Sequence, residues 1–366
     1  MRIFDLKFNN NSQTYFSKKL KTIFNQGFFS NHTMVKNFEI KFKKFNKSKF
    51  CIATSSGTSA LEIILRSLNI KNKNVLISAN TFIATAHAIK NAGGKLIPID
   101  IEKENFMMCP KDLKKKINKK IGAVVIVHIG GIVTPNIFLI KKICKQFNIP
   151  LVEDAAQAQG SSFKNIKAGN FGIAGAISFF TTKVMTTGEG GMITTNSKKL
   201  YEKMQSLRQY GFKSSDQTLF NKISSNYKMN EFSAALGLTE LERIKERITK
   251  RNLLAKVYQD YFSNSNKFIL LKATKYSYCN HYKQIFISNF NRYKIKKYLL
   301  RFKIPLTGGV YNTPIHKQPI YKKELKKFKL PNTDYFCNSH FCPPCYPELS
   351  LKDIKKVCKV LDSFKN

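Results

Sequence analysis

The sequence has no tryptophan, few acidic residues and no long apolar run. It carries 22 Asp and Glu residues against 63 Lys and Arg residues, a formal net charge of +41 in 366 residues. No run of about 18 apolar residues occurs, which argues against a transmembrane helix and a membrane partner. The first twelve residues lack the apolar core and cleavage site of a signal peptide, so we expect a cytoplasmic protein.

The eight cysteines form no evident disulfide framework, and in the cytoplasm they should stay reduced. Cys337, His340, Cys342 and Cys345 suggest a zinc site, because the last two have CxxC spacing. The single residue between His340 and Cys342 is cramped for shared tetrahedral ligation, and no second CxxC exists. We therefore expect reduced loop cysteines and no metal.

The high positive charge first suggests a nucleic acid or an anionic membrane as partner. Lysine greatly outnumbers arginine, however, and the basic residues are spread from Lys7 to Lys365 alongside abundant Asn, Ile and Phe. A residue bias over the whole protein, as A+T-rich codons would produce, explains this better than a binding stripe. No nucleic-acid partner is expected, and a basic nucleic-acid-binding protein is kept only as a distant alternative.

Apolar periodicity predicts an α/β region over residues 50–195. Short buried strands are expected at 75–78, 95–99, 123–128, 151–153 and 176–180, alternating with helices at 58–68, 85–91 and 137–147. This order implies a mostly parallel sheet with helices on both faces. Ligands of such sheets bind beyond the carboxyl ends of the strands, where loops 55–59 and 154–159 should converge.

A different pattern follows. One amphipathic helix is expected at 229–251, then strands at 268–271 and 283–287 and helices at 293–302 and 351–364. We therefore predict a large domain over residues 1–245, including an N-terminal arm, and a smaller C-terminal α+β domain over 246–366.

Two segments place chemical groups at that sheet edge. In SSGTSAL at 55–61, the N–H groups of a helix start, with the hydroxyls of Thr58 and Ser59, could hold a phosphate; simple helix capping is the alternative. In LVEDAAQAQG at 151–160, Asp154 ends a strand and could stabilise a protonated ring nitrogen. A surface carboxylate is the alternative for Asp154.

Two further segments follow. In AISFFTTKVMTTGEGG at 176–191, Lys183 lies between an apolar strand and a glycine-rich turn, surroundings that should lower its pKa and favour the neutral amine of a Schiff base. In SNYKMNE at 225–231, Asn226 could cap the long helix.

Together these segments resemble the DegT/DnrJ/EryC1/StrS family of pyridoxal-phosphate-dependent sugar aminotransferases. NTFIATA at 80–86, EDAAQ at 153–157, SFFTTK at 178–183, NYKMNE at 226–231 and AALGL at 234–238 carry the resemblance, as do PIHKQP at 314–319 and Tyr346-Pro347. The similarity spans residues 27–361 in the order of the family. The sequence departs from the pattern at Asn31-His32-Thr33, at 342–345 and at its N-terminus. These departures affect the expected contacts with the substrate and not those with the cofactor.

The resemblance implies the fold type I of pyridoxal-phosphate enzymes and a role for each matching residue. Lys183 would form the Schiff base and move a proton, and Asp154 would pair with the pyridine nitrogen. Phe82 would stack on the ring, with Gln157 near its phenolic oxygen or other face. The phosphate would be held by Gly57, Thr58 and Ser178, and by Asn226 from the neighbouring subunit of a homodimer. Asn31 and His316 are weaker candidates for contacts with the sugar nucleotide, and a loop histidine without a ligand is the alternative for His316.

The implied activity is transfer of an amino group from glutamate to a keto-deoxysugar linked to a nucleotide, for cell-surface polysaccharide or glycan synthesis. Whether C3 or C4 is aminated, and which nucleotide is used, stays open. A dehydratase of the same fold would have histidine in place of Lys183, and a non-catalytic relative would lack cofactor residues that this chain retains.

Overall fold

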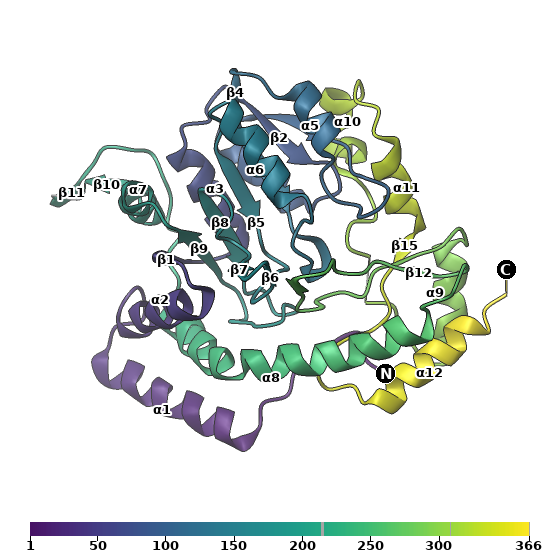
Figure 1. Cartoon of the computed structure of the whole chain (residues 1–366). Helices are drawn as coiled ribbons and strands as arrows, with labels where there is room; N and C mark the ends of the chain where they lie inside the picture. The colour runs from purple at the N-terminus through teal and green to yellow at the C-terminus, as the bar shows by residue number, and fades with distance from the viewer. Residues whose placement is uncertain (214–215, 308, 366) are drawn as a thin grey trace.

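The structure, a computed structural model, describes residues 1–213, 216–307 and 309–365, and a seven-stranded sheet lies at its centre (Figure 1). The spatial order of its strands is β1 (Phe50–Thr54), β9 (Gly191–Thr195), β8 (Ala174–Ser178), β5 (Leu151–Asp154), β4 (Ile121–Val127), β2 (Asn74–Ser78) and β3 (Lys95–Ile99). β9 runs antiparallel to both of its neighbours, β1 and β8, and all other neighbouring strands of this sheet are parallel. The predicted mostly parallel sheet is confirmed.

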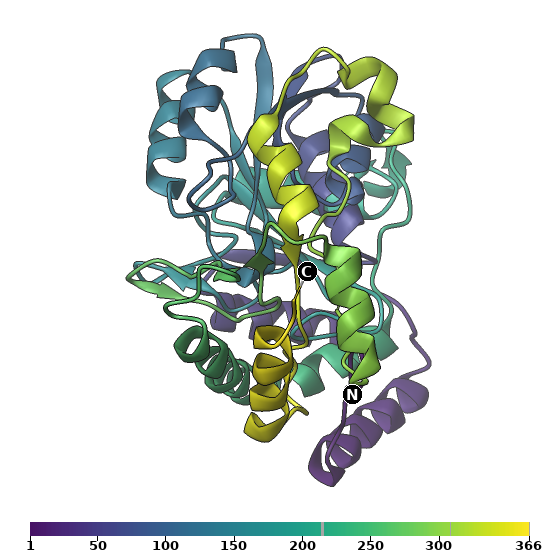
Figure 2. The ribbon, with the colours of Figure 1, turned by 90° about the vertical axis from the view of Figure 1, so that its right-hand side faces the viewer.

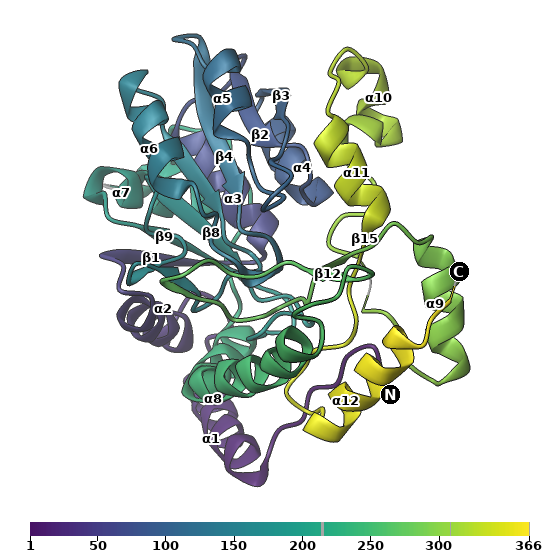
Figure 3. The same cartoon turned by 45° about the vertical axis from the view of Figure 1, so that its right-hand side comes forward.

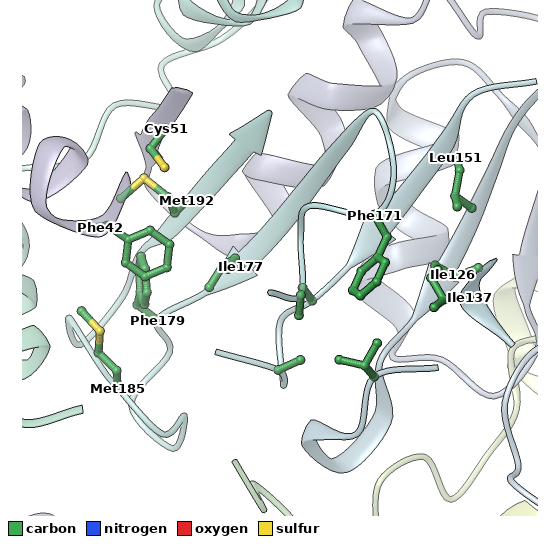
Figure 4. Close-up of a cluster of buried hydrophobic side chains, with 14 of the residues drawn as sticks. Phe42, Cys51, Ile126, Ile137, Leu151, Phe171, Ile177, Phe179, Met185 and Met192 are labelled. Carbon is green, nitrogen blue, oxygen red and sulfur yellow. The ribbon is translucent and has the colours of Figure 1, made fainter. Parts of the chain in front are cut away.

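Helices cover both faces of the sheet because successive strand residues point to opposite sides. In β4, which is buried throughout, Val124 and Ile126 join one apolar core, whereas Ala123 and Val125 join the other. The first core packs against α2 (Thr33–Asn46), α5 (Pro110–Lys116), α6 (Ile137–Gln146) and part of α8, and Figure 4 shows part of it, including Phe42, Phe171 and Phe179. The second packs against α3 (Gly57–Ser67), α4 (Ile83–Asn91) and α7 (Lys198–Arg208).

The long helix α8 (Glu231–Tyr261) runs below the sheet in Figure 1 and joins two apolar cores. Its residue Ile248 belongs to the first core of the sheet, whereas Leu254 and Tyr258 belong to a separate C-terminal core. Because Leu254 and Tyr258 pack in the C-terminal core, the helix continues past its predicted end at residue 251. The predicted domain boundary at 245/246 lies within this helix. The predicted cap was wrong: the side chain that accepts a hydrogen bond at the start of α8 is that of Asn230, not Asn226.

The C-terminal core lies under a small sheet of β12 (Ile269–Leu270), β14 (Phe286–Ile287) and β15 (His340–Phe341), with α9 (Arg292–Arg301) and α12 (Leu351–Asp362) beside it (Figure 3). Between them, the short helix η2 (Ile315–Lys317), α10 (Pro319–Leu325) and α11 (Pro331–Ser339) return to the large sheet, where Ile315 and Tyr321 enter its second core. The C-terminal part of the chain therefore packs both in the small sheet, through β15, and against the large sheet, through Ile315 and Tyr321.

The remaining elements lie outside the large sheet and the helices that cover it. They are α1 (Asn10–Gln26), the short helix η1 (Ile129–Gly131), which is buried, the three-stranded sheet of β13 (Ser277–Tyr278), β6 (Ser162–Phe163) and β7 (Ile166–Lys167), and the pair β10 (Phe212–Lys213) and β11 (Asp216–Phe220). Figure 2 shows α1 projecting below the body of the molecule. The residues before α1 contact the C-terminal half, where the Tyr346 hydroxyl donates to the carbonyl of Arg2 over 3.1 Å. Among the described residues, no helix combines the length and apolarity needed to cross a bilayer.

Candidate active site

A cavity of about 470 Å³ lies where β5 and β8 end, at the start of α3 and against the C-terminal half of the chain. The loops that follow parallel strands meet at this edge, which is where the sequence places a ligand. All but one of the predicted cofactor residues line the cavity: Gly57, Thr58, Phe82, Asp154, Gln157, Ser178 and Lys183.

The start of α3 forms one end of the cavity. Ser56 caps the helix by accepting the N–H of Ser59 over 3.0 Å, so the first-turn N–H groups of Gly57 and Thr58 have no carbonyl within the helix to bind. A Cβ atom on Gly57 would lie 2.7 Å from Cβ of Ser178. The glycine thus lets α3 reach the end of β8, and these N–H groups and hydroxyls together fit a phosphate.

The adjacent carboxylates at the end of β5 point to opposite sides of the sheet. Asp154 faces the cavity, where its Oδ2 accepts a 2.7 Å hydrogen bond from the Thr85 hydroxyl. Glu153 is fully buried, and its two oxygens accept bonds from His128 Nε2 and from three backbone N–H groups, those of Gly169, Phe171 and Gly172. Asp154 therefore supplies the cavity with a carboxylate, whereas Glu153 holds the loop that leads into β8.

Lys183 lies in the turn after β8, with its Nζ in the cavity and 4.8 Å from the ring centroid of Tyr282. The Tyr282 hydroxyl is 3.1 Å from the Thr182 hydroxyl. Burial alone would raise the pKa of Tyr282, but the charges of Lys183 and Lys283 and the bond from Thr182 outweigh it and lower that pKa. The amine of Lys183 is thus held over an aromatic face without an ion-pair partner among the described residues.

Gln157 joins two loops at the side of the cavity. Its Oε1 accepts the N–H of Gly130 over 2.7 Å, and its Nε2 donates to the Tyr311 hydroxyl over 3.1 Å. Burial, helped by the charge of Asp154, raises the pKa of Tyr311 far above its usual value, so this phenol stays neutral. Phe82, at the start of α4, is 61% exposed although it lines the cavity. An exposed aromatic face beside a fixed carboxylate and a free amine fits a planar, cationic ring.

Two of the predicted residues lie together, away from this cavity. Asn226 is exposed and pairs through its backbone with Gln209, whose side-chain Oε1 accepts a 3.3 Å hydrogen bond from Asn31. His316 also lies outside the cavity lining. It is buried, with Nε2 3.0 Å from Asp334, and burial lowers its pKa against the opposing effect of that carboxylate.

The cysteine-rich segment shows no ligand cluster. His340 accepts the N–H of Val310 with Nε2 and lies 2.8 Å from the Phe336 carbonyl with Nδ1, so both ring nitrogens are used within the fold. In the part of the chain that the structure describes, no three His, Cys, Asp or Glu side chains are grouped to hold a metal ion. The described cysteines are all free thiols.

Sequence reasoning missed the opposite wall of the cavity, formed by Ile3, Phe4, Arg251, Tyr282, Lys283 and Tyr311. None of these residues stands in a motif with a recognisable spacing. They reach the cavity only because the N-terminal segment and the loops around β14 fold back over the large sheet. The only local signal was the predicted strand at 283–287, which begins at Lys283 directly after Tyr282.

Comparison with known proteins agrees with this geometry. The chain matches the DegT/DnrJ/EryC1/StrS aminotransferase family over residues 11–362. It is 29% identical over 334 residues to GDP-perosamine synthase of Escherichia coli O157:H7, covering 90% of each chain. A UDP-4-amino-4,6-dideoxy-N-acetyl-beta-L-altrosamine transaminase of Campylobacter jejuni is 30% identical over 338 residues, which cover 90% of this chain and 89% of the relative.

Among solved structures, PseC of Helicobacter pylori, an aminotransferase involved in the biosynthesis of pseudoaminic acid, superimposes with a TM-score of 0.90 at 23% identity, covering 99% of each chain. This likeness confirms the expected fold. The family match over nearly the whole length confirms the resemblance carried by the motifs. The chain is therefore a member of the DegT/DnrJ/EryC1/StrS aminotransferase family, and its cofactor is pyridoxal phosphate.

Proposed function

We propose that the chain acts in the cytoplasm, where it transfers an amino group from glutamate to a keto-deoxysugar linked to a nucleotide. The observation that carries this proposal is the meeting of Lys183, Asp154 and the start of α3 in one cavity, from loops that are far apart in the sequence. The names of the relatives, which include two nucleotide-sugar enzymes and a spore coat polysaccharide biosynthesis protein of Bacillus subtilis, support this class of substrate and a role in surface polysaccharides.

Each residue then has a defined task. When bound, pyridoxal phosphate supplies the electron sink that makes the bond at the reacting carbon labile. Asp154, fixed by Thr85, keeps a negative charge beside the ring nitrogen and so favours its protonated form. The start of α3 and Ser178 hold the phosphate, and the Lys183 amine, when free, carries a proton to and from the reacting carbon.

Replacement of Lys183 tests the proposal. Lys183→Ala should reduce amino transfer from glutamate to GDP-, UDP- and dTDP-linked 4-keto-6-deoxysugars by about 100-fold or more, because the reactive amine is lost. Lys199→Ala, which removes an exposed lysine of α7, is the matched control and should retain the wild-type rate. Borohydride treatment of the yellow wild-type protein should add mass to the peptide containing Lys183. Wild-type turnover by Lys183→Ala would contradict the proposal, as would a wild-type chain that is inactive both on these sugars and on their 3-keto isomers.

We also propose that two copies of the chain share their active sites. Asn226 and Asn31 lie on the same surface, and neither lines the cavity of its own chain. Beside them, Phe24, Phe28 and Phe29 are each at least half exposed. An exposed group of aromatic rings next to polar residues is typical of a protein interface. A second copy seated there would receive these asparagines at its own cavity.

Mixed dimers test this arrangement. Lys183→Ala and Asn226→Ala chains, unfolded together and refolded, should form about half mixed dimers, in which one site is intact and the other carries both defects. About a quarter of all sites would then be wild-type, so activity should rise well above that of either parent. If Asn226 serves its own chain, every site keeps one defect and mixing gives no gain.

A further inference from the structure

Lys283 lies in the wall of the cavity that the C-terminal half of the chain contributes. The residue is half-buried two positions before β14 starts, and its backbone N–H donates to the Gly130 carbonyl over 3.2 Å. This bond ties the lysine to the loop after β4, on the large sheet. The Nζ donates to the Thr307 carbonyl over 2.5 Å and lies 5.4 Å from the centre of the Tyr282 ring. The ammonium group is thus held in place at the cavity rather than extended into solvent.

Three basic side chains line the cavity, and two of them already have a task. Lys183 is assigned to the cofactor. Arg251 is buried, and its Nη1 donates to the backbone carbonyls of His281, Tyr282 and Cys345. Its role is therefore to hold these loops in place within the fold. Lys283 is the third, and nothing in the proposed cofactor chemistry uses it.

The charge of Lys283 is uncompensated. No carboxylate of the described residues lies within 4.0 Å of its Nζ, and the acidic residues in the cavity lining are Asp154 and Glu189. An ammonium group has three N–H donors, and the contact with Thr307 uses one of them. Its charge also contributes to the lowered pKa of Tyr282, which indicates a positive potential at this wall. A half-buried cation with free donors and no acidic partner favours an oxyanion from a ligand.

We propose that Lys283 binds an anionic oxygen group of the substrate, either a carboxylate of the amino donor or the diphosphate of the sugar nucleotide. The inference rests on the proposed function, since both substrates of that reaction are anions that must enter the same cavity. The cofactor phosphate has its own site at the start of α3, so Lys283 is free for a second anion. A lysine ammonium acts as a point charge and suits either group.

The experiment compares Lys283→Met, which removes the charge at similar length, with Lys283→Arg, which keeps it. Lys272→Met, an exposed lysine just beyond β12, is the matched control. In the first arm, UDP, GDP and dTDP are titrated into the cofactor-free chains by calorimetry, a readout that needs no catalysis. In the second arm, the half-reaction of the loaded chains with glutamate is followed over a range of glutamate concentrations. Thermal unfolding midpoints verify that the variants fold.

Lys283→Met should weaken one of these interactions by about 10-fold or more, while Lys283→Arg and Lys272→Met stay within about 2-fold of wild type. Weaker binding of any of these nucleoside diphosphates, with unchanged glutamate saturation, identifies the diphosphate as the ligand. A raised glutamate concentration at half-saturation, with unchanged nucleotide binding, identifies the carboxylate. Suppose that the wild-type chain reacts with glutamate, but that Lys283→Met changes neither nucleotide binding nor glutamate saturation by more than 2-fold. The inference is then wrong, although the proposed function stands. A wild-type chain that does not react with glutamate refutes the proposed function instead.

Discussion

Substitutions of the two adjacent carboxylates of β5 should have different effects, one on stability and the other on catalysis. Glu153→Gln and Asp154→Asn are the same chemical change, a carboxylate replaced by its amide, at neighbouring positions that face opposite sides of the sheet. We expect Glu153→Gln to destabilise the chain and leave the chemistry intact. Asp154→Asn should do the reverse.

The expected size follows from the hydrogen bonds. Oε1 of Glu153 accepts the N–H groups of Phe171 and Gly172, and a glutamine carbonyl can still accept both. Oε2 accepts the N–H of Gly169 and the Nε2 of His128, and there the amide would present N–H groups to donors. One buried backbone N–H therefore loses its acceptor, and a buried charge-assisted bond is lost with it, which costs about 3 kcal/mol of unfolding free energy. At Asp154, the amide oxygen can still accept the N–H of Ala156, as Oδ1 does over 3.1 Å, and the amide N–H can donate to the Thr85 hydroxyl, so we expect a loss below about 1 kcal/mol.

Two measurements distinguish the residues. Urea unfolding of the cofactor-free chains, followed by circular dichroism, should show a lowered midpoint for Glu153→Gln alone. Single-turnover reaction of the loaded chains with glutamate should slow by orders of magnitude for Asp154→Asn alone, because the ring nitrogen loses the charge that favours its protonation. The reasoning is refuted if Glu153→Gln unfolds at the wild-type midpoint, or if Asp154→Asn reacts at the wild-type rate.

Two further predictions concern close packing and pH. Gly57→Ala should lower the free energy of unfolding by about 1–3 kcal/mol, because the new Cβ would lie 2.7 Å from Cβ of Ser178. It should also weaken pyridoxal phosphate binding in an absorbance titration. The double variant Gly57→Ala, Ser178→Gly should regain part of the stability but not the affinity. Burial lowers the pKa of His340 to about 4, against 6.5 when exposed, so between these values the unfolded chain binds more protons than the folded one. The free energy of unfolding should therefore fall, by up to about 1.4 kcal/mol per pH unit for this group, as pH drops from 6.5 to 4, and His340→Gln should make that dependence shallower in urea titrations. A wild-type midpoint for Gly57→Ala, or the same pH slope with and without His340, would contradict them.

The sequence predicted the parts of the fold whose signals are local. The buried strands, the carboxylate at the end of β5 and the lysine after β8 each follow from a short pattern, and parallel topology then brings them to one edge. The opposite wall could not be predicted, because Tyr282 and Lys283 reach Lys183 across about a hundred residues of intervening chain. The end of α8 was missed for a similar reason: Leu254 and Tyr258 extend it by packing on a core made of later segments.

The continuity of α8 also bears on how the cavity behaves when ligands arrive. The helix passes from one apolar core to the other between Ile248 and Leu254, and Arg251 binds carbonyls of the C-terminal half at that point. A rotation of one half against the other would have to bend the helix or break these bonds. The width of the cavity is therefore set when the chain folds, and crystals grown from the cofactor-free protein should tolerate soaking with cofactor and substrate without cracking.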